Sequence, residues 1–397
     1  MYGGLLTLAR GIPIIALFIA ATLLPEDGFG RISIVVTAIA TASLLSDSGL
    51  DTAATWLLAR TDQGVEFGAI VSSLVLVRMA LAAVAVLAML GPQASVLVGG
   101  SDNAFMLLAF SVAAGMAMAY CSALRIQLRV RGHGEVETLL VEKLSAGVLF
   151  IILVILLKEE LLNELWVYPA CCLIGAVAAA LGRRLQAGSP TFTAVRRMLS
   201  AAAPFVVTTV AAALVWRSPV FLLGTQGAFE EAGFFALASY PIILLSSVSV
   251  LSAPLLLLQG RVNQVEKRHF QITALVGVVA AVALIIVAAV GSSGVFPLPV
   301  ATASLATMAY LAPALVPLWL NPQLSTWLRT RVGLWAPTLP SIAGAVVGIG
   351  VILWLIPTHG SKGAAIGIVT AESLALFLYC ELRRREPSRI ARGKNDA

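Results

Sequence analysis

The sequence is poor in charge. Only 12% of its 397 residues are Asp, Glu, Lys or Arg, whereas 59% are hydrophobic, and the mean hydropathy is +0.96. Soluble domains carry about 25% charged residues, so this chain has too little polar residue to coat a soluble globule. We therefore expect an all-α, polytopic membrane protein. Its net charge of +6 is expected to reflect basic cytoplasmic loops rather than binding to nucleic acid.

The residue patterns of most enzyme and metal sites are also missing. No glycine-rich phosphate loop is present, which excludes ATP hydrolysis by the chain itself. The three histidines lie far apart in loops, and the four cysteines lie in or beside apolar runs without metal-ligand spacing. These residues are His133, His269, His359, Cys121, Cys171, Cys172 and Cys380. We expect no cofactor, no metal and no enzymatic activity.

Long apolar runs are plentiful. A membrane-spanning helix needs about 20 mostly apolar residues. Twelve runs meet this requirement: 4–24, 31–58, 68–90, 103–124, 139–157, 165–182, 199–223, 232–258, 269–290, 298–320, 333–355 and 363–382. The run 31–58 is overlong, so it could tilt or end in an interfacial turn. The first run carries Arg10 and no cleavage site, which favours a retained span over a signal peptide.

The basic residues indicate the topology. With the N-terminus in the cytoplasm and twelve alternating spans, 21 of the 26 Lys and Arg residues fall on the cytoplasmic side. Adding or losing one early span would invert the later loops and remove this bias. The positive-inside rule therefore predicts that both termini are cytoplasmic. We expect the chain to lie in the cytoplasmic (inner) membrane.

The longest loop divides the chain at its midpoint. It predicts an N-terminal six-helix lobe over 1–182, a cytoplasmic inter-lobe loop over 183–198, a C-terminal six-helix lobe over 199–382 and a basic cytoplasmic tail over 383–397. Gly30 and Gly233 introduce similar segments 203 residues apart, a weak sign of an internal repeat. Repeats of this kind often place a substrate site between the halves of a transporter.

Six charged residues lie six or more residues from either end of the predicted spans: Arg10, Asp47, Asp51, Arg78, Arg217 and Glu372. Arg78 is central, because it stands alone in the run 68–90, and an arginine at mid-membrane costs at least roughly 2.5 kcal/mol. Arg10 and Asp51 are expected at similar depth, where they could pair. Asp47 and Asp51 are four residues apart, which predicts one face of one helix.

Two roles remain open for these charges. They could pair with one another inside the bundle, with Arg78 and Glu372 at matching depth as one such pair. Alternatively, the arginines could line a cavity for an anion, because guanidinium groups match phosphate and carboxylate and stay protonated. Asp47, Asp51 and Glu372 could then carry a coupling ion or form salt bridges. The aromatic residues near span ends, Trp216 among them, are expected to be interfacial anchors.

Several short motifs in a consistent order resemble those of the polysaccharide-transport flippases. Phe29-Gly30 opens the second span, and Ser46-Asp-Ser-Gly-Leu50 closes it. The segments Arg217-Ser-Pro-Val-Phe-Leu-Leu-Gly224 and Gly233-Phe-Phe-Ala-Leu-Ala238 resemble the motifs around spans seven and eight. Pro254 and Gly360-Ser-Lys-Gly-Ala-Ala365 extend the likeness through most of the chain. One departure is Pro219, which stands where that family has an aspartate.

The resemblance is to the O-antigen and exopolysaccharide flippases of the multidrug/oligosaccharidyl-lipid/polysaccharide exporter superfamily. It implies two six-helix lobes around a central cavity that opens in turn to each side. The implied substrate is an oligosaccharide linked to polyprenyl pyrophosphate. Arg78 and Arg217 would line the cavity, with Arg10 nearer the cytoplasmic entrance. Membrane lipids, a polysaccharide polymerase and glycosyltransferases are the implied partners.

Two alternatives remain open. An ion-coupled multidrug exporter of the same superfamily would need carboxylates to dominate the cavity, against which the arginines argue. A membrane polysaccharide polymerase or ligase would need a long outer loop, and the longest outer loop, 91–102, holds one charge.

Overall fold

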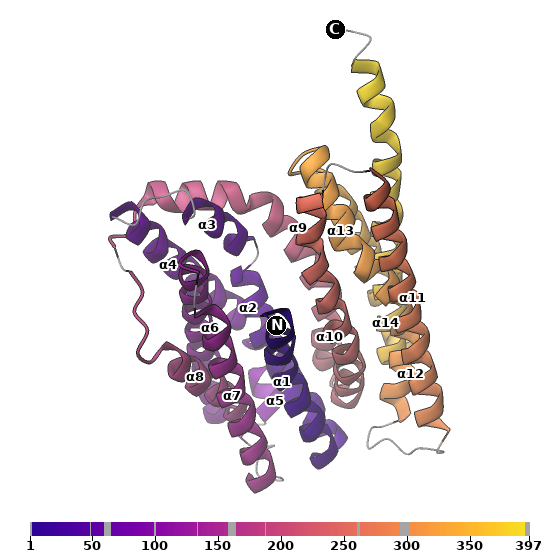
Figure 1. Ribbon diagram of the computed structural model, residues 1–397. Coiled ribbons are helices and arrows are strands. Elements are labelled where there is room, and N and C mark those ends of the chain that lie inside the picture. The colour runs from indigo at the N-terminus through magenta and orange to yellow at the C-terminus, as the bar shows by residue number, and fades with distance from the viewer. Residues whose placement is uncertain are drawn as a thin grey trace. The chain divides into compact units, whose positions relative to one another are not determined.

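Helices make up all the regular structure that the computed structural model describes (Figure 1). The described residues are 2–47, 49–58, 65–98, 101–132, 134–157, 164–186, 188–259, 263–293 and 302–393. Their elements are α1 (Tyr2–Leu23), α2 (Glu26–Asp47), α3 (Leu50–Leu58), α4 (Val65–Leu90), α5 (Ala94–Val98), α6 (Ser101–Val130), α7 (Glu135–Leu157), α8 (Val167–Ala180), α9 (Phe192–Thr225), α10 (Phe229–Gln259), α11 (Asn263–Ser292), α12 (Thr302–Leu311), the 3₁₀ turn η2 (Ala312–Ala314), α13 (Leu315–Arg331) and α14 (Thr338–Gly393). The predicted all-α class is confirmed.

The helices account for the predicted spans. Within the described ranges, nine helical stretches are long and apolar enough to cross a membrane, and Gly11–Leu23 and Val167–Ala180 are shorter apolar helices. The stretch Thr338–Arg385 contains two predicted spans, which a break at Gly360 (φ 53°, ψ −132°) separates. Counted in this way, the described residues of each of the twelve predicted spans are mostly helical, with 31–58 shared between α2 and α3. The chain is a multi-pass membrane protein.

The overlong second span is divided in two. α2 ends at Asp47 and α3 begins at Leu50. Between them Gly49 has φ +75°, a left-handed conformation that side chains with a Cβ rarely adopt. The site also lacks room, because a Cβ at Gly49 would lie 2.2 Å from the Cβ of Phe205 on α9. The glycine thus allows a sharp turn against α9, and the run does not continue as one helix.

The chain divides into two compact units. Unit 1 comprises Met1–Ala213 and Val220–Gly233, and unit 2 comprises Leu214–Pro219 and Phe234–Ala397. In unit 1, α7 packs against α1 and α8, and α4 packs against α2 and α6. In unit 2, α13 packs against α11 and α14. α9 contributes residues to both units. The six-helix lobes with boundaries at 182 and 199 stay a prediction.

The two glycines that suggested an internal repeat contact each other within unit 1. A Cβ on Gly30 of α2 would lie 1.8 Å from the carbonyl oxygen of Phe229, and one on Gly233 would lie 3.1 Å from the Cα of Gly30. The next side chain, Arg31, lies over the Phe229 ring at 4.6 Å and donates to the Leu97 carbonyl at 2.7 Å. The absence of side chains therefore lets α2 and the start of α10 meet at their backbones.

The loop between α8 and α9 is hydrogen-bonded to α4 and α6 within unit 1. The buried side chain of Gln127 on α6 donates to the Arg184 carbonyl at 3.2 Å and accepts from the Gln186 amide at 2.8 Å. The Gly188 amide donates to the Ser72 hydroxyl on α4 at 3.0 Å. These bonds satisfy backbone groups that would otherwise be unpaired. The loop predicted to separate two lobes thus follows α4 and α6 closely.

Candidate functional site

Arg78 lies on α4, more than three turns from either end of the helix, and its side chain is fully buried. The guanidinium forms ion pairs with two carboxylates, Asp47 and Asp51, and the Nη1–Oδ1 distance to Asp51 is 2.7 Å. Both aspartates keep about 30% of their side-chain surface exposed. The cost of a buried cation is therefore offset by two opposite charges. In this arrangement the carboxylates, rather than the guanidinium, form the accessible face.

The two aspartates reach Arg78 from different helices. Asp47 is the last residue of α2, and Asp51 lies in the first turn of α3, where the helix dipole favours a negative charge. The prediction that they share one face of one helix is wrong, because the chain turns at Gly49 between them. The turn nevertheless brings both carboxylates to the same cation. The spacing therefore predicted correctly that the two aspartates lie close together, but through a turn and not through one helix face.

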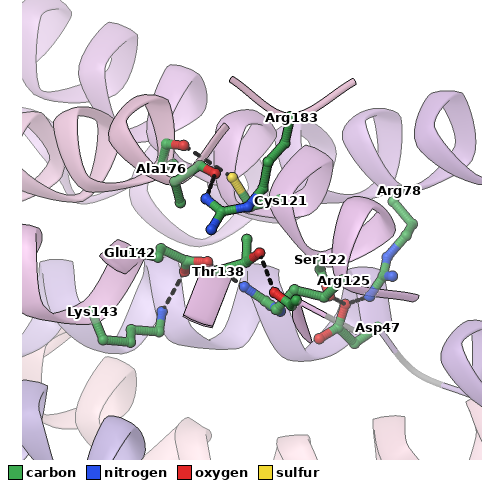
Figure 2. A network of polar contacts seen from close by, with 12 residues as sticks. Asp47, Arg78, Cys121, Ser122, Arg125, Thr138, Glu142, Lys143, Ala176 and Arg183 are labelled. Atoms are coloured by element: carbon green, nitrogen blue, oxygen red, sulfur yellow. Dashed lines mark hydrogen bonds and ion pairs between the residues drawn. The ribbon is translucent and has the colours of Figure 1, made fainter. Parts of the chain in front are cut away.

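Further polar contacts continue from Asp47 into α6 and α7 (Figure 2). The Ser122 hydroxyl on α6 donates to Asp47 Oδ1 at 3.1 Å. One turn further along α6, Arg125 pairs with the buried Glu142 of α7, which also receives Lys143 Nζ at 2.7 Å. Serine, arginine and lysine side chains thus supply donors for both acids. The contacts link α2, α4, α6 and α7.

These groups form one electrostatic assembly, which we call the unit 1 charge cluster. Arg125 and Arg129 act electrostatically on both Asp51 and Arg78, and Arg129 pairs with Glu135. The cluster holds four acids and four bases: Asp47, Asp51, Glu135, Glu142, Arg78, Arg125, Arg129 and Lys143. Its formal charges cancel. A neutral, internally paired cluster ties helices together and presents no net charge to a ligand.

Glu372 lies on α14 in unit 2, in surroundings of a different kind. Its Oε1 accepts a hydrogen bond from the indole Nε1 of Trp216 at 2.8 Å, and its Oε2 accepts one from Asn321 Nδ2 at 2.8 Å. Both donors are neutral. In the described part of the chain, no basic side chain lies within ion-pair distance of this carboxylate.

Arg217 lies beside Trp216 in the α9 segment that belongs to unit 2, and it is half-buried. Over the residues for which side chains are described, no acid pairs with it. Arg10 lies in α1, but its side chain is outside the described residues. Arg217 is therefore a cation within a predicted span that has no acidic partner among the described side chains.

The predicted site residues thus separate into groups. Asp47, Asp51 and Arg78 come together. The expected pairing of Asp51 with Arg10 cannot be compared, because the Arg10 side chain lies outside the described residues. Glu372 contacts Trp216 and Asn321 in place of the expected Arg78. The cavity roles of Arg10, Arg78 and Arg217 stay predictions.

Sequence reasoning missed two contributors to the Glu372 site. Trp216 was expected to be an interfacial anchor, yet its indole N–H donates to a carboxylate. Asn321 falls one residue beyond the predicted run 298–320, which placed it outside the membrane. The sequence shows only a polar amide before Pro322 at the end of the apolar run, and the structure continues α13 through both residues.

Cysteine and metal chemistry find no support in the described ranges. All four cysteines are free, and the Cys121 thiol donates to the Ala176 carbonyl at 3.1 Å (Figure 2). Across the same ranges, no group of three His, Cys, Asp or Glu side chains is arranged to hold a metal ion.

Comparison with known sequences identifies a family. The family model described as polysaccharide biosynthesis protein matches residues 2–258, which is more than half of the chain. No curated protein matches the chain significantly in sequence. The match includes α1 to α10, and therefore the unit 1 charge cluster and Arg217.

Solved structures share the fold at low sequence identity. A structure of the lipid II flippase MurJ in an inward closed conformation has a TM-score of 0.73 and 10% identity, over 96% of this chain and 86% of that one. An inward-facing multidrug resistance MATE family transporter of the MOP superfamily gives 0.66 and 13%, over 96% of each chain. A MOP superfamily transporter from Pyrococcus furiosus gives 0.57 and 15%, over 96% and 95%. The chain has the fold of this superfamily.

Proposed function

The chain belongs to the family of polysaccharide biosynthesis proteins, and from this premise we propose that it moves a polyprenyl-pyrophosphate-linked oligosaccharide across the cytoplasmic membrane by alternating access. Such a substrate has three parts with different needs. The lipid tail can stay in the bilayer, the sugar needs a wet path, and the pyrophosphate needs cationic donors within the membrane. We place both termini in the cytoplasm, in accordance with the basic loops.

The observation that carries this proposal is Arg217. It is an intramembrane arginine with no acidic partner in the described part of the chain, within the segment that the family match includes. A guanidinium in this state can donate two parallel hydrogen bonds to a phosphate. We assign Arg217 as the principal contact to the pyrophosphate. A structural neighbour described as a lipid II flippase supports a flippase reading of the fold.

Arg78 and Arg10 have secondary roles in the proposal. Arg78 lies behind the carboxylates of Asp47 and Asp51, which pair with its guanidinium, so it reaches the cavity and meets a substrate anion only when those carboxylates move away. Arg10 lies nearer the cytoplasmic entrance. This ordering makes Arg217 a contact in every state, and it makes Arg78 a contact that depends on the state of the transporter.

An ion-coupled multidrug exporter is the second candidate, since multidrug transporters share this fold. The family match favours the polysaccharide substrate, and the unpaired Arg217 favours an anion over a cationic drug. Deletion of the gene separates the two. Loss of surface polysaccharide with unchanged drug sensitivity supports the flippase, and the reverse pattern supports the exporter.

The decisive experiment uses Arg217→Ala in a strain that lacks the chromosomal gene. At unchanged protein level, we expect this variant to lose polysaccharide assembly and to accumulate lipid-linked oligosaccharide on the cytoplasmic side. Arg217→Lys should restore part of the activity, because it keeps the charge and loses the two-pronged contact. Arg385→Ala is the matched control, since Arg385 is exposed and pairs with Glu381 in the next turn. Normal assembly in Arg217→Ala would contradict the proposal.

A further inference from the structure

Glu372 is an acid held entirely by neutral donors. Its two carboxylate oxygens each accept one hydrogen bond, from Trp216 and from Asn321, both at 2.8 Å. The acids of the unit 1 charge cluster have arginine or lysine partners instead. An ionised carboxylate inside a membrane without a counter-charge is costly. Among the described acids within spans, Glu372 therefore gains the most from binding a proton.

The elements that pack against α14 bring neither a second acid nor an ion-pairing cation to Glu372. α12, η2 and α13 pack against α14, and their sequences contain no aspartate or glutamate. Their titratable or charged residues are Tyr310 on α12 and Arg329 and Arg331 on α13, while α14 itself contributes Tyr379 and α9 contributes Arg217. None of these cations reaches ion-pair distance of Glu372 in the described structure. The protonation state of this carboxyl is therefore not fixed by a salt bridge.

Asn321 can serve both forms of the carboxyl group. Its side chain is only 8% exposed, its Nδ2 donates to Glu372, and its Oδ1 is buried without a partner. The amide oxygen and nitrogen have nearly the same size, so a half-turn of the amide exchanges donor and acceptor in place. After that turn, Oδ1 can accept a hydrogen bond from a protonated Oε2. One side chain thus stabilises both the anion and the neutral acid.

We propose that Glu372 takes up and releases one proton in each transport cycle. In the uptake step a hydronium ion transfers its proton to Oε2 and becomes water, the carboxylate becomes a neutral carboxyl, and the Asn321 amide turns to accept the new O–H. Release reverses these changes. The inference rests on the proposed transport function for the cycle, whereas the proton site itself stands on the geometry of three side chains.

The donors around Glu372 favour a proton over a sodium ion. Sodium needs several oxygen ligands, and here nitrogen donors already occupy one position on each carboxylate oxygen. Trp216 can only donate, so it cannot ligate a metal. Trp216 also lies in the α9 segment Leu214–Pro219, which belongs to unit 2 although the rest of α9 belongs to unit 1. The hydrogen bond to Glu372 is therefore made by a residue of α9, the helix that contributes residues to both units.

Trp216 supplies a reporter that needs no substrate. The full chain, labelled with ¹⁵N-tryptophan and purified in detergent, gives one indole N–H resonance for each of its seven tryptophans. Trp216→Phe identifies the resonance of Trp216. We expect this resonance to shift in a single step as the pH of the sample is raised, and to stop shifting in Glu372→Gln. Glu381→Gln removes an acid from the same helix outside the site and should leave the titration unchanged.

Three results would overturn the assignment of the proton site. The Trp216 resonance could be independent of pH in the wild type, or it could titrate unchanged in Glu372→Gln. It could also respond to sodium at constant pH, which would make this a metal-ion site. Glu372→Asp keeps a titratable group, so retained titration there guards against a variant that fails to fold.

A transport measurement then tests the coupling. Glu372→Gln should lose polysaccharide assembly at normal protein level, whereas Glu381→Gln should retain it. Wild-type assembly in Glu372→Gln would overturn the coupling, whatever the indole resonance does. If the wild-type chain itself fails to restore assembly in the deletion strain, the proposed function fails, and the titration still decides the proton site.

Discussion

Replacement of Arg78 by methionine should destabilise the protein strongly. The side chain is fully buried, and it neutralises two carboxylates that would otherwise face each other. Removing one partner of a buried ion pair costs about 3–5 kcal/mol. Because Asp47 and Asp51 stay about 30% exposed, water can solvate them in part. We therefore expect a loss near the lower end, about 3 kcal/mol.

The same reasoning predicts a rescue. In the triple variant Arg78→Met, Asp47→Asn, Asp51→Asn, no charge is left without a partner, and neutral replacement of a whole buried ion pair often costs little. The triple variant should recover most of the lost stability. The assay is the apparent melting temperature in detergent, read from the monodisperse fraction on size exclusion after heating. An unchanged melting temperature in Arg78→Met, or a triple variant no more stable than the single one, would refute the reasoning.

Two further predictions concern close packing and the docked loop. Gly30→Ala should lower the melting temperature, because its Cβ would lie 1.8 Å from the Phe229 carbonyl oxygen and overpacking costs about 1–3 kcal/mol. Gly350→Ala on α14 is the matched control, since nothing lies within 4 Å of its Cβ. Equal effects in both variants would argue against the backbone contact. Gln127→Ala should expose the loop after α8, which the amide now holds through Arg184 and Gln186, and trypsin should then cut faster at Arg183 and Arg184. Gln226→Ala, at an exposed position, should leave the cleavage rate unchanged.

Much of the fold follows from the sequence because hydrophobic length is a direct requirement of the bilayer. The described residues of each predicted span are mostly helical for this reason. Element ends were less predictable, as the second span illustrates. The run 31–58 has no proline, and its excess length indicates either a tilted helix or an interfacial turn without deciding between them. The turn arises from the conformation of Gly49 and the close approach of Phe205, and that tertiary contact is invisible in a list of hydropathies.

The charged site could be predicted only in part, for a related reason. Depth along a helix follows from residue number, and depth alone suggested pairing of Asp51 with Arg10 and of Arg78 with Glu372. Rotation about each helix axis does not follow from residue number. Arg78 and Glu372 have similar predicted depth, yet each contacts other residues. Asn321 was missed because its helix extends past the apolar run that defined the span.

Charged side chains within the spans are paired in unit 1 but not in unit 2, and this difference bears on which of them serve structure and which serve function. In unit 1, paired acids and bases account for every described ionisable side chain of the charge cluster, so pairing alone explains why those residues are tolerated. In unit 2, Glu372 accepts a hydrogen bond from Trp216, which precedes Arg217 in α9, yet Arg217 and Glu372 do not pair with each other in the described structure. Mutual neutralisation would have been the least costly arrangement. A cation and an acid kept apart at this cost are better explained by external partners, an anion for Arg217 and a proton for Glu372.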